Sequence, residues 1–480
     1  MRLRSILFLF ACIWVSGIAS NVAAIQLAPD RAAPNVVLIV ADDLGWTDLG
    51  CTGSTFYETP NLDRLAKMGT VFTNAYSTCQ VCSPTRASLQ TGKYPQRVGI
   101  TDYCGAPQPD NWKRNTPMLP APYSEKLALE EITLAEKLKS AGYATLFAGK
   151  WHLGPEGFWP EDQGFDFNFG GIERGGPYGG NKYFSPYGNP RITDGPDGEH
   201  LPDRLAEETS KFIASHRNQP FFANVCFYSV HTPLMAREDL KAKYETKAQG
   251  LDPERQVWGE EGERKVRLVQ DHAVYAGMVE AMDQAVGKIL KAIDDNGLRE
   301  NTVVIFTSDN GGLSTSEGHP TSNLPLRAGK GWIYEGGIRV PTIVSVPQLQ
   351  TSLPNSSDAV INSADFYPTV LELCNVDLDH KIDGKSFVPV LQGHDFDRGP
   401  IFWHYPHYGN QGGTPSAAVR EGKWKLVQWF ETGGYELFNL QEDVSELDNR
   451  IQNQPAIAER LKSKLMAWQS EVGAQFPSRR

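Results

Sequence analysis

The chain has 480 residues, of which 40% are hydrophobic and 21% are charged, an ordinary composition for a globular protein with a sizeable core. Its length suits about three domains, or one large α/β domain with a smaller one. The net charge of −11 argues against nucleic acid as a partner, since binding nucleic acid requires clustered positive charge.

The first 24 residues have the three parts of a secretion signal. Arg2 and Arg4 form a basic end, residues 6–19 are largely apolar, and residues 22–24 (VAA) suit cleavage. We therefore expect an exported protein, periplasmic or extracellular, or lysosomal in a eukaryote; loss of the two arginines takes its net charge from −11 to −13. An anchoring helix is the alternative, but no stop-transfer flank follows, and no later run reaches the ~20 apolar residues of a membrane span.

Four strands and two helices are predicted before residue 310. Residues 35–40 (NVVLIV) form a continuous apolar run, typical of a central parallel strand buried on both faces. One helix covers residues 59–69, with a Thr-Pro start and a glycine stop, and another opens with a Thr-x-x-Glu capping box at residue 133 and stops near residue 142. The remaining strands are predicted at residues 143–148, 221–230 and 302–307.

Polar groups able to do chemistry follow each predicted strand at once. In chain order they are Asp42 and Asp43, Lys150 and His152, His231, and Asp309 and Asn310. Because ligands bind outside the carboxyl ends of the strands in open α/β sheets, we expect these side chains to converge on one crevice. The alternative is that polar residues follow strands simply because loops are polar. That would explain one or two of these strand ends better than all four.

The rest of the chain divides into a long loop and a smaller C-terminal part. Residues 154–187 are rich in Gly, Phe, Tyr and Trp and lack periodicity, which predicts a loop over the sheet edge. Short strands and a final helix are predicted after residue 393: 417–420, 424–429, 435–439 and 455–472. The fold class is therefore α/β, with a mostly parallel sheet in a catalytic domain (25–393) and an antiparallel sheet in an α+β subdomain (394–480).

Asp42, Asp43, Asp309 and Asn310 all carry hard oxygen ligands, the set that suits Ca²⁺ or Mg²⁺ rather than a thiolate-preferring metal. Two adjacent acids alone could be turn formers or helix caps. A second oxygen pair at the end of another strand favours a cation, which holds like charges together in a crevice.

The stretch CSPTRASLQTGK (82–93) resembles the Cys-x-Pro-x-Arg signature of type I sulfatases, in the alkaline phosphatase superfamily. Further similar blocks fall in that family's order: ADDLGWTDLG (41–50), TPNLDRLAKMGTVFTNAY (59–76), GKWHLG (149–154), HTP (231–233), TSDNGG (307–312), GKGWIYEGGIRVP (329–341) and AVREGKWKLV (418–427). Within the family the sequence is most similar to the arylsulfatase A and N-acetylgalactosamine-6-sulfatase type. Thr85 stands where serine is common, and it keeps a small hydroxyl.

The resemblance implies that a maturation enzyme oxidises Cys82 to Cα-formylglycine, with the neighbours of Cys82 as its recognition sequence. A hydrated aldehyde has two hydroxyls. One can attack sulfur in line and expel an alcohol, and the other, once deprotonated, can collapse back to the aldehyde and eject sulfate. The predicted activity is that of a sulfuric ester hydrolase acting on an aryl sulfate or a sulfated carbohydrate.

The resemblance also implies a role for each matched residue. The cation, Ca²⁺ in this family with Mg²⁺ also permitted by the ligands, would lower the pKa of the attacking hydroxyl. Its implied ligands are Asp42, Asp43, Asp309, Asn310 and the modified Cys82. The other implied roles are that Arg86 fixes the aldehyde hydrate, Lys150 and Lys330 hold the sulfate oxygens, His152 drives sulfate release, and His231 with Lys330 assists the departing alcohol.

Three alternatives stay open at this point. Cys79 and Cys82 could form a redox pair or half a zinc site, although the sequence has neither a thioredoxin-like pattern nor a second cysteine pair. A phosphonate monoester hydrolase or phosphodiesterase of the same superfamily would share the cation and the strand-end geometry. A catalytically dead glycan-binding protein would result if Cys82 is never matured.

Sugar contacts are predicted in the C-terminal part. His404 and His407 lie among bulky aromatic residues with no obvious core face, which predicts hydrogen bonds to sugar hydroxyls. The family resemblance implies a sulfated glycan of the galactose or N-acetylgalactosamine type, with small aryl sulfates as artificial substrates.

Overall fold

The computed structural model describes residues 33–349 and 354–480. The predicted secretion signal at residues 1–24 lies outside the described residues. Within the described ranges, none of the helices is both long enough and apolar enough to cross a membrane.

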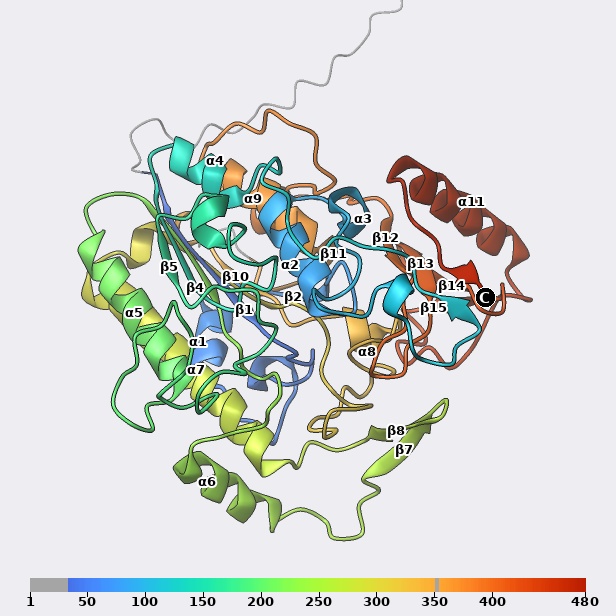
Figure 1. The fold of residues 1–480 in the computed structure, drawn as a ribbon, viewed down its shortest axis with the longest axis horizontal. Helices are drawn as coiled ribbons and strands as arrows, with labels where there is room; N and C mark the ends of the chain where they lie inside the picture. Colours follow the sequence, from blue (N-terminus) through green and yellow to red (C-terminus); the bar gives the residue numbers. More distant parts are fainter. Residues whose placement is uncertain (1–32, 350–353) are drawn as a thin grey trace, which may run out of the picture. The chain divides into compact units, whose positions relative to one another are not determined.

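A mostly parallel eight-stranded sheet forms the core of the described chain (Figure 1). Across the sheet, its strands are β11 (Ser356–Asn362), β2 (Thr70–Tyr76), β10 (Ile343–Ser345), β9 (Thr302–Ser308), β1 (Asn35–Ala41), β6 (Phe221–Cys226), β4 (Ala144–Gly149) and β5 (Phe167–Phe169). Strand β10 pairs antiparallel with β2 and β9, whereas the other neighbouring pairs are parallel. The predicted fold class is confirmed for this sheet.

Strand β1 lies in the interior of the sheet and is buried along its whole length. It pairs in parallel with β9 on one side and β6 on the other, so that Val40 lies opposite both Thr307 and Cys226. Successive side chains point to opposite faces, and both faces are covered by helices. A strand in that position needs apolar side chains on both faces, which is why the sequence reads as an uninterrupted apolar run.

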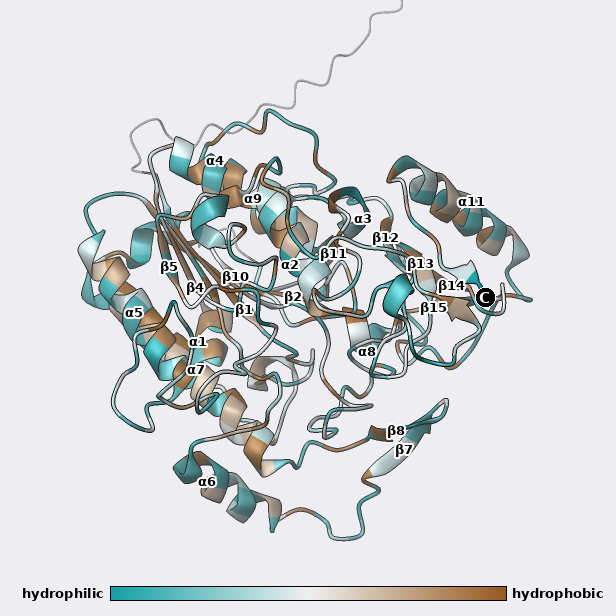
Figure 2. Cartoon of the chain, in the orientation of Figure 1, coloured by the Kyte–Doolittle hydropathy of each residue, from teal (hydrophilic) through white to brown (hydrophobic). Residues whose placement is uncertain are grey.

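Two helical layers enclose the sheet. Val37 and Ile39 pack with one layer and Val36 and Leu38 with the other, and the strands between them are the most hydrophobic part of the ribbon (Figure 2). The first layer contains α1 (Pro60–Lys67), α5 (Leu201–Ser215) and α7 (Ala273–Asp295). The second contains α2 (Cys82–Thr91), α4 (Leu134–Ser140) and α9 (Phe366–Leu373).

The strands that precede the predicted polar groups are all present, and they are neighbours in the order β9-β1-β6-β4. The strand predicted at residues 221–230 is shorter in the structure, because β6 ends at Cys226 and residues 227–230 form a loop that leads to His231. The predicted loop at 154–187 also contains the edge strand β5, which pairs with β4. With only three residues, β5 is too short to show an alternation of apolar and polar residues in the sequence.

The two helix starts differ from each other. At α4 the predicted capping box is present: the Thr133 hydroxyl accepts from Glu136 N (3.1 Å), and the Glu136 carboxylate accepts from Thr133 N (2.8 Å). At α1, Thr59 is the N-cap residue and Pro60 follows as the first helical residue, as predicted, but the Thr59 hydroxyl accepts from Gly50 N (2.9 Å) instead of a helix N–H. Thr59 therefore fixes the loop before α1 rather than the helix itself.

The C-terminal part contains the predicted antiparallel sheet with the predicted helix packed on it. Its strands, in order, are β12 (Ile401–Tyr405), β13 (Ser416–Glu421), β14 (Trp424–Trp429) and β15 (Tyr435–Asn439), and the helix is α11 (Pro455–Glu471). Strand β12 was not predicted, because all five of its residues are buried and show no alternation. The boundary at residue 393 stays a prediction.

Shorter elements complete the described chain. They are α3 (Pro95–Val98), α6 (Glu238–Ala248), α8 (Glu335–Ile338), α10 (Val388–Leu391), the pair β3 (Met118–Leu119) and β16 (Ser478–Arg479), and the hairpin of β7 (Trp258–Glu261) and β8 (Arg264–Arg267).

A buried ion network joins the C-terminal sheet to the segment that follows Lys330. Lys425 Nζ, on β14, lies 3.0 Å from Glu335 Oε1 and 2.8 Å from Glu446 Oε1. Glu446 also accepts a hydrogen bond from the backbone N of Glu335 (2.6 Å). All three residues are fully buried, and Glu335 has a second cationic partner in Arg339, whose NH1 lies 3.6 Å from Glu335 Oε2. Lys425 is therefore the ammonium that the two carboxylates share away from water.

Replacement of Lys425 should therefore destabilise the protein strongly. Lys425→Met keeps the volume but leaves Glu446 without its cation and Glu335 with only the longer pair to Arg339, and we expect the free energy of unfolding to fall by about 3–5 kcal/mol. Chemical denaturation measures this value. Lys423→Met, at an exposed position on the same hairpin, is the matched control and should change it by less than about 0.5 kcal/mol. Equal, small effects of the two substitutions would contradict a structural role for the network.

Candidate active site

The predicted crevice exists at the carboxyl ends of β9, β1, β6 and β4. Asp42 and Asp43 follow β1, Asp309 and Asn310 follow β9, and Lys150 follows β4 directly. Ala41 and Ser308 lie opposite each other at the ends of their strands. The register of neighbouring strands therefore brings these polar groups together, as predicted.

Backbone geometry at the strand ends is specialised. Asp43 and His152 have φ values of 61° and 58°, in the left-handed region that non-glycine residues rarely adopt. Gly149, just before Lys150, has φ 102°, and a Cβ atom there would lie 1.9 Å from the carbonyl oxygen of Cys226. Only glycine fits this close approach of β4 to β6, which sets the direction in which Lys150 leaves the sheet.

Three buried ion pairs hold the charges of the crevice. Lys150 Nζ lies 2.7 Å from Asp42 Oδ2, Lys330 Nζ lies 2.7 Å from Asp43 Oδ1, and Arg86 NH2 lies 2.7 Å from Asp309 Oδ2. Burial lowers the pKa of a lysine, but the negative charges near Lys330, led by Asp43 and Glu317, together outweigh burial and raise its pKa. Burial likewise opposes ionisation of Asp43, yet Lys330 and His231 hold its pKa below the usual value.

The carboxylate cluster fits a divalent cation. One oxygen from each of Asp42, Asp43 and Asp309 lies within 4.8 Å of the others. Asp42 Oδ1 and Asn310 Oδ1 are buried and have no hydrogen-bond partner among the residues that the structure describes. Asn310 Nδ2 donates to Asp43 Oδ1 (2.8 Å), which fixes the amide orientation. Carboxylate and amide oxygens are ligands that Ca²⁺ and Mg²⁺ prefer.

Cys82 is the first residue of α2 and faces a cavity of about 430 Å³. Its Sγ lies 3.5 Å from His152 Nδ1, and the other ring nitrogen of His152 lies 2.9 Å from the carbonyl oxygen of Cys104. The Ser83 hydroxyl donates to the carbonyl oxygen of His152 (2.9 Å). The start of α2 thus holds both the thiol and the imidazole beside it.

His231 lies on another wall of the same cavity. Its Nδ1 lies 2.7 Å from the carbonyl oxygen of Thr232, and its Nε2 lies 3.8 Å from Asp43 Oδ2. Burial and the charge of Lys330 lower the pKa of His231 to about 3, and burial and Lys150 lower that of His152 well below its usual value. Both imidazoles are neutral in this environment.

Four of the six predicted catalytic residues line the cavity: Cys82, His152, His231 and Lys330. Arg86 and Lys150 are buried behind them, against the carboxylates. Cys79 is not bonded to Cys82 and packs instead with Val81 and Tyr405 in the core.

Comparison with known proteins identifies the family. The sulfatase family profile matches residues 34–376, and the profile described as N-sulphoglucosamine sulphohydrolase, C-terminal, matches residues 328–471. The chain belongs to the sulfatase family. It is thus a sulfuric ester hydrolase, as predicted.

Individual relatives agree with this assignment. A sulfatase of Formosa agariphila is 33% identical over 91% of this chain and 88% of its own length, and N-acetylgalactosamine-6-sulfatase of Rattus norvegicus is 33% identical over 84% and 73%. The crystal structure of Ps i-CgsB in complex with k-i-k-neocarrahexaose is 28% identical and covers 91% of this chain and 92% of that one, with a TM-score of 0.74. The phosphonate monoester hydrolase of Agrobacterium radiobacter is similar in fold alone: TM-score 0.63, 20% identity, and coverage of 93% and 99%.

The predicted sugar contacts at His404 and His407 are wrong for this sulfatase. Both side chains are buried, and neither lines the cavity. His404 Nε2 lies 2.8 Å from the carbonyl oxygen of Gln475, and His407 Nε2 lies 2.9 Å from the Thr101 hydroxyl. The sequence could not reveal this, because the partners of both imidazoles come from distant segments that fold over β12 and the turn after it.

The cavity also contains residues that sequence reasoning missed, among them Tyr103, Tyr178, Glu317 and Gln411. Glu317 lies in the segment that follows β9, so the rule that placed Asp309 could have been extended to it. Gln411 lies in the C-terminal part, where the sequence carries no signal that it reaches the cavity.

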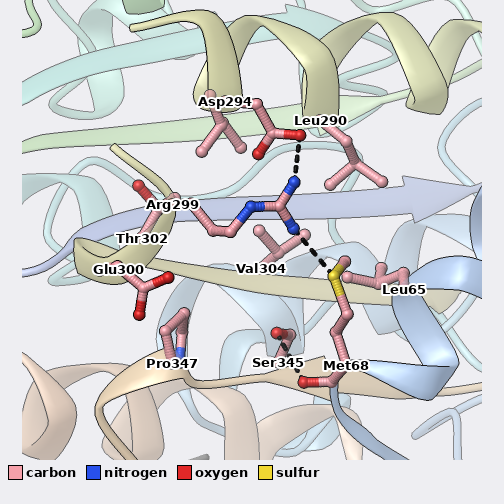
Figure 3. A pocket seen from close by; sticks show the side chains of 11 residues that line it. Leu65, Met68, Leu290, Asp294, Arg299, Glu300, Thr302, Val304, Ser345 and Pro347 are labelled. Atoms are coloured by element: carbon pink, nitrogen blue, oxygen red, sulfur yellow. Dashed lines mark hydrogen bonds and ion pairs between the residues drawn. The ribbon is translucent and has the colours of Figure 1, made fainter. Parts of the chain in front are cut away.

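A second pocket of the sulfatase, about 90 Å³, lies at the opposite end of the sheet, beside Thr302 at the start of β9 (Figure 3). Leu290 and Val304 contribute to its apolar wall, and Arg299 pairs with Asp294 across it. Open α/β sheets bind ligands at the other strand ends, where the catalytic groups gather. We therefore assign the chemistry to the larger cavity.

Proposed function

We propose that this sulfatase is exported and hydrolyses a sulfate ester of a glycan, using Cys82 after its conversion to Cα-formylglycine and a bound Ca²⁺. The observation that carries the proposal is the position of Cys82: it faces the cavity at the start of α2, with His152 3.5 Å from its Sγ. A thiol that only filled the core would not need an imidazole and three buried ion pairs around it.

Relatives support the glycan as substrate class. One is named for sulfated N-acetylgalactosamine, and the Ps i-CgsB structure holds k-i-k-neocarrahexaose. We extend this to a sugar of the galactose or N-acetylgalactosamine type. Export is proposed from the leader alone, and maturation of Cys82 makes a formylglycine-generating enzyme a further partner.

The proposed cation site consists of Asp42, Asp43, Asp309 and Asn310 together with the modified Cys82. A bound Ca²⁺ would balance the clustered carboxylates and lower the pKa of a hydroxyl beside it. Arg86 is already fixed on Asp309 and donates to the carbonyl oxygen of Lys150 (2.8 Å), so it is placed to hold the modified side chain in one orientation.

The remaining groups divide between binding and proton transfer. Lys330 lines the cavity, which suits it to sulfate oxygens, whereas Lys150, to which the family resemblance gives the same role, is buried against Asp42. His152, beside Cys82, is placed to accept a proton when sulfate leaves. His231, on a different wall and next to Lys330, is placed to assist the departing alcohol together with that lysine.

The nearest alternative is phosphoryl transfer, since a phosphonate monoester hydrolase shares the fold. Hydrolysis of 4-nitrophenyl sulfate and bis(4-nitrophenyl) phosphate separates the two, because the leaving group is the same. We expect kcat/KM to be higher for the sulfate ester. A higher value for the phosphate diester would support the alternative, and hydrolysis of neither by matured protein would support a glycan-binding protein without activity.

Removal of the cation should abolish turnover reversibly. A calcium chelator should lower kcat by about 100-fold or more, and added Ca²⁺ should restore it, since without the cation the pKa of the attacking hydroxyl is no longer lowered. Asp309→Asn should prevent restoration, whereas Asp395→Asn, at an exposed position, should not. Calorimetric titration with Ca²⁺ gives an independent readout of binding. Normal rates in chelator would contradict the proposed site.

His152 and His231 should fail at different steps. His152→Ala should release about one equivalent of alcohol and then stall, because the step that it serves comes after the alcohol has left. His231→Ala should slow alcohol release by about 10²–10⁴-fold, most severely for poor leaving groups. Stopped-flow measurement of the alcohol product distinguishes the two.

An exposed histidine provides the control for that experiment. His394→Ala should behave as wild type, because the imidazole lies outside the cavity. The same kinetic defect in His152→Ala and His231→Ala would mean that the two roles are wrongly assigned.

A further inference from the structure

The cavity that takes an anionic substrate also contains a carboxylate, that of Glu317. One of its oxygens lies within 4.8 Å of a ring nitrogen of His231 and of an oxygen of Asp43. Lys330, the basic group on the same cavity wall, pairs with Asp43 and not with Glu317. A negative charge so close to a bound sulfate ester weakens binding unless it meets a hydrogen-bond donor of the substrate.

The position of Glu317 is fixed by the protein. Its φ of 52° is in the left-handed region, and such a conformation persists in a non-glycine residue only where its surroundings hold it. Gln411 makes the contacts that fix it: the Gln411 Nε2 donates to Glu317 Oε1 (2.5 Å), and the Gln411 backbone oxygen accepts from the Thr315 hydroxyl (3.2 Å). Glu317 is therefore presented to the cavity in one orientation.

Gln411 connects this carboxylate to the segment that carries Lys330. Its backbone oxygen also accepts from Trp332 Nε1 (3.0 Å). A Cβ atom on Gly331 would lie 2.6 Å from its side-chain oxygen, so the amide packs directly on that glycine. The C-terminal part thus sets the spacing between Glu317 and the lysine.

We infer that Glu317, held by Gln411, is a specificity residue that accepts a hydrogen bond from a neutral donor next to the sulfated oxygen and rejects a second anionic group there. The inference rests on the proposed function, because it places the ester oxygen at His231. From there, a substituent on the neighbouring carbon reaches Glu317. The preferred substrate therefore has a free hydroxyl, or an amide N–H, beside its sulfate ester and no second sulfate at that position.

Three small esters test this without knowledge of the sugar: phenyl sulfate, catechol monosulfate with a free neighbouring hydroxyl, and catechol disulfate with a neighbouring sulfate. Glu317→Gln keeps the shape and removes the charge. Relative to phenyl sulfate, the substitution should lower kcat/KM for the monosulfate by about tenfold and raise it for the disulfate by a similar factor. Gln411→Ala, which releases Glu317, should change both ratios in the same directions.

Glu263→Gln, at an exposed position between β7 and β8, is the matched control and should leave both ratios at wild-type values. Thermal melting establishes that each variant is folded. Equal loss on all three esters in Glu317→Gln would mean that Glu317 acts through His231, and unchanged ratios would mean that it meets no substrate group; either result overturns the inference. Failure of the proposed function is distinct, since matured wild-type protein would then hydrolyse none of the three esters.

Discussion

Charge balance in a buried crevice is the constraint on which the rest of this structure depends. Asp42, Asp43 and Asp309 are removed from water at the ends of two adjacent strands, where like charges repel strongly. Each of these carboxylates has a basic partner from a different segment of the chain. The parallel sheet solves this problem because its strand ends bring distant segments to one edge.

The same constraint explains why the C-terminal part belongs to the active site. Lys330 must be held against Asp43 although it lies on a long irregular segment. Gln411 packs on Gly331 beside it, and the buried Lys425 network fixes Glu335 further along that segment. Loss of the C-terminal sheet would therefore release a cation of the crevice as well as expose apolar surface.

The sequence predicted the parts of the fold and site that local patterns specify. Fully buried strands such as β1 appear in the sequence as apolar runs. The polar residues that follow the ends of such runs predicted the site residues Asp42, Lys150, His231 and Asp309. Elements without a local pattern were missed, including the three-residue strand β5 and the uniformly buried β12.

Contacts between distant segments were beyond local patterns as well. The local sequence gives His404 and His407 no core face, yet distant residues bury both. Gln411 reaches the cavity only because the C-terminal part folds over the segment after β9.

The mass of the tryptic peptide that spans residues 68–86 tests the central claim most directly, when it is measured together with sulfate release from the same preparations. This peptide contains Cys82 and also Cys79 as an internal thiol control. The account predicts an aldehyde in place of the Cys82 thiol, an unchanged Cys79, and activity proportional to the aldehyde fraction. Full activity in protein whose Cys82 remains a thiol would contradict it.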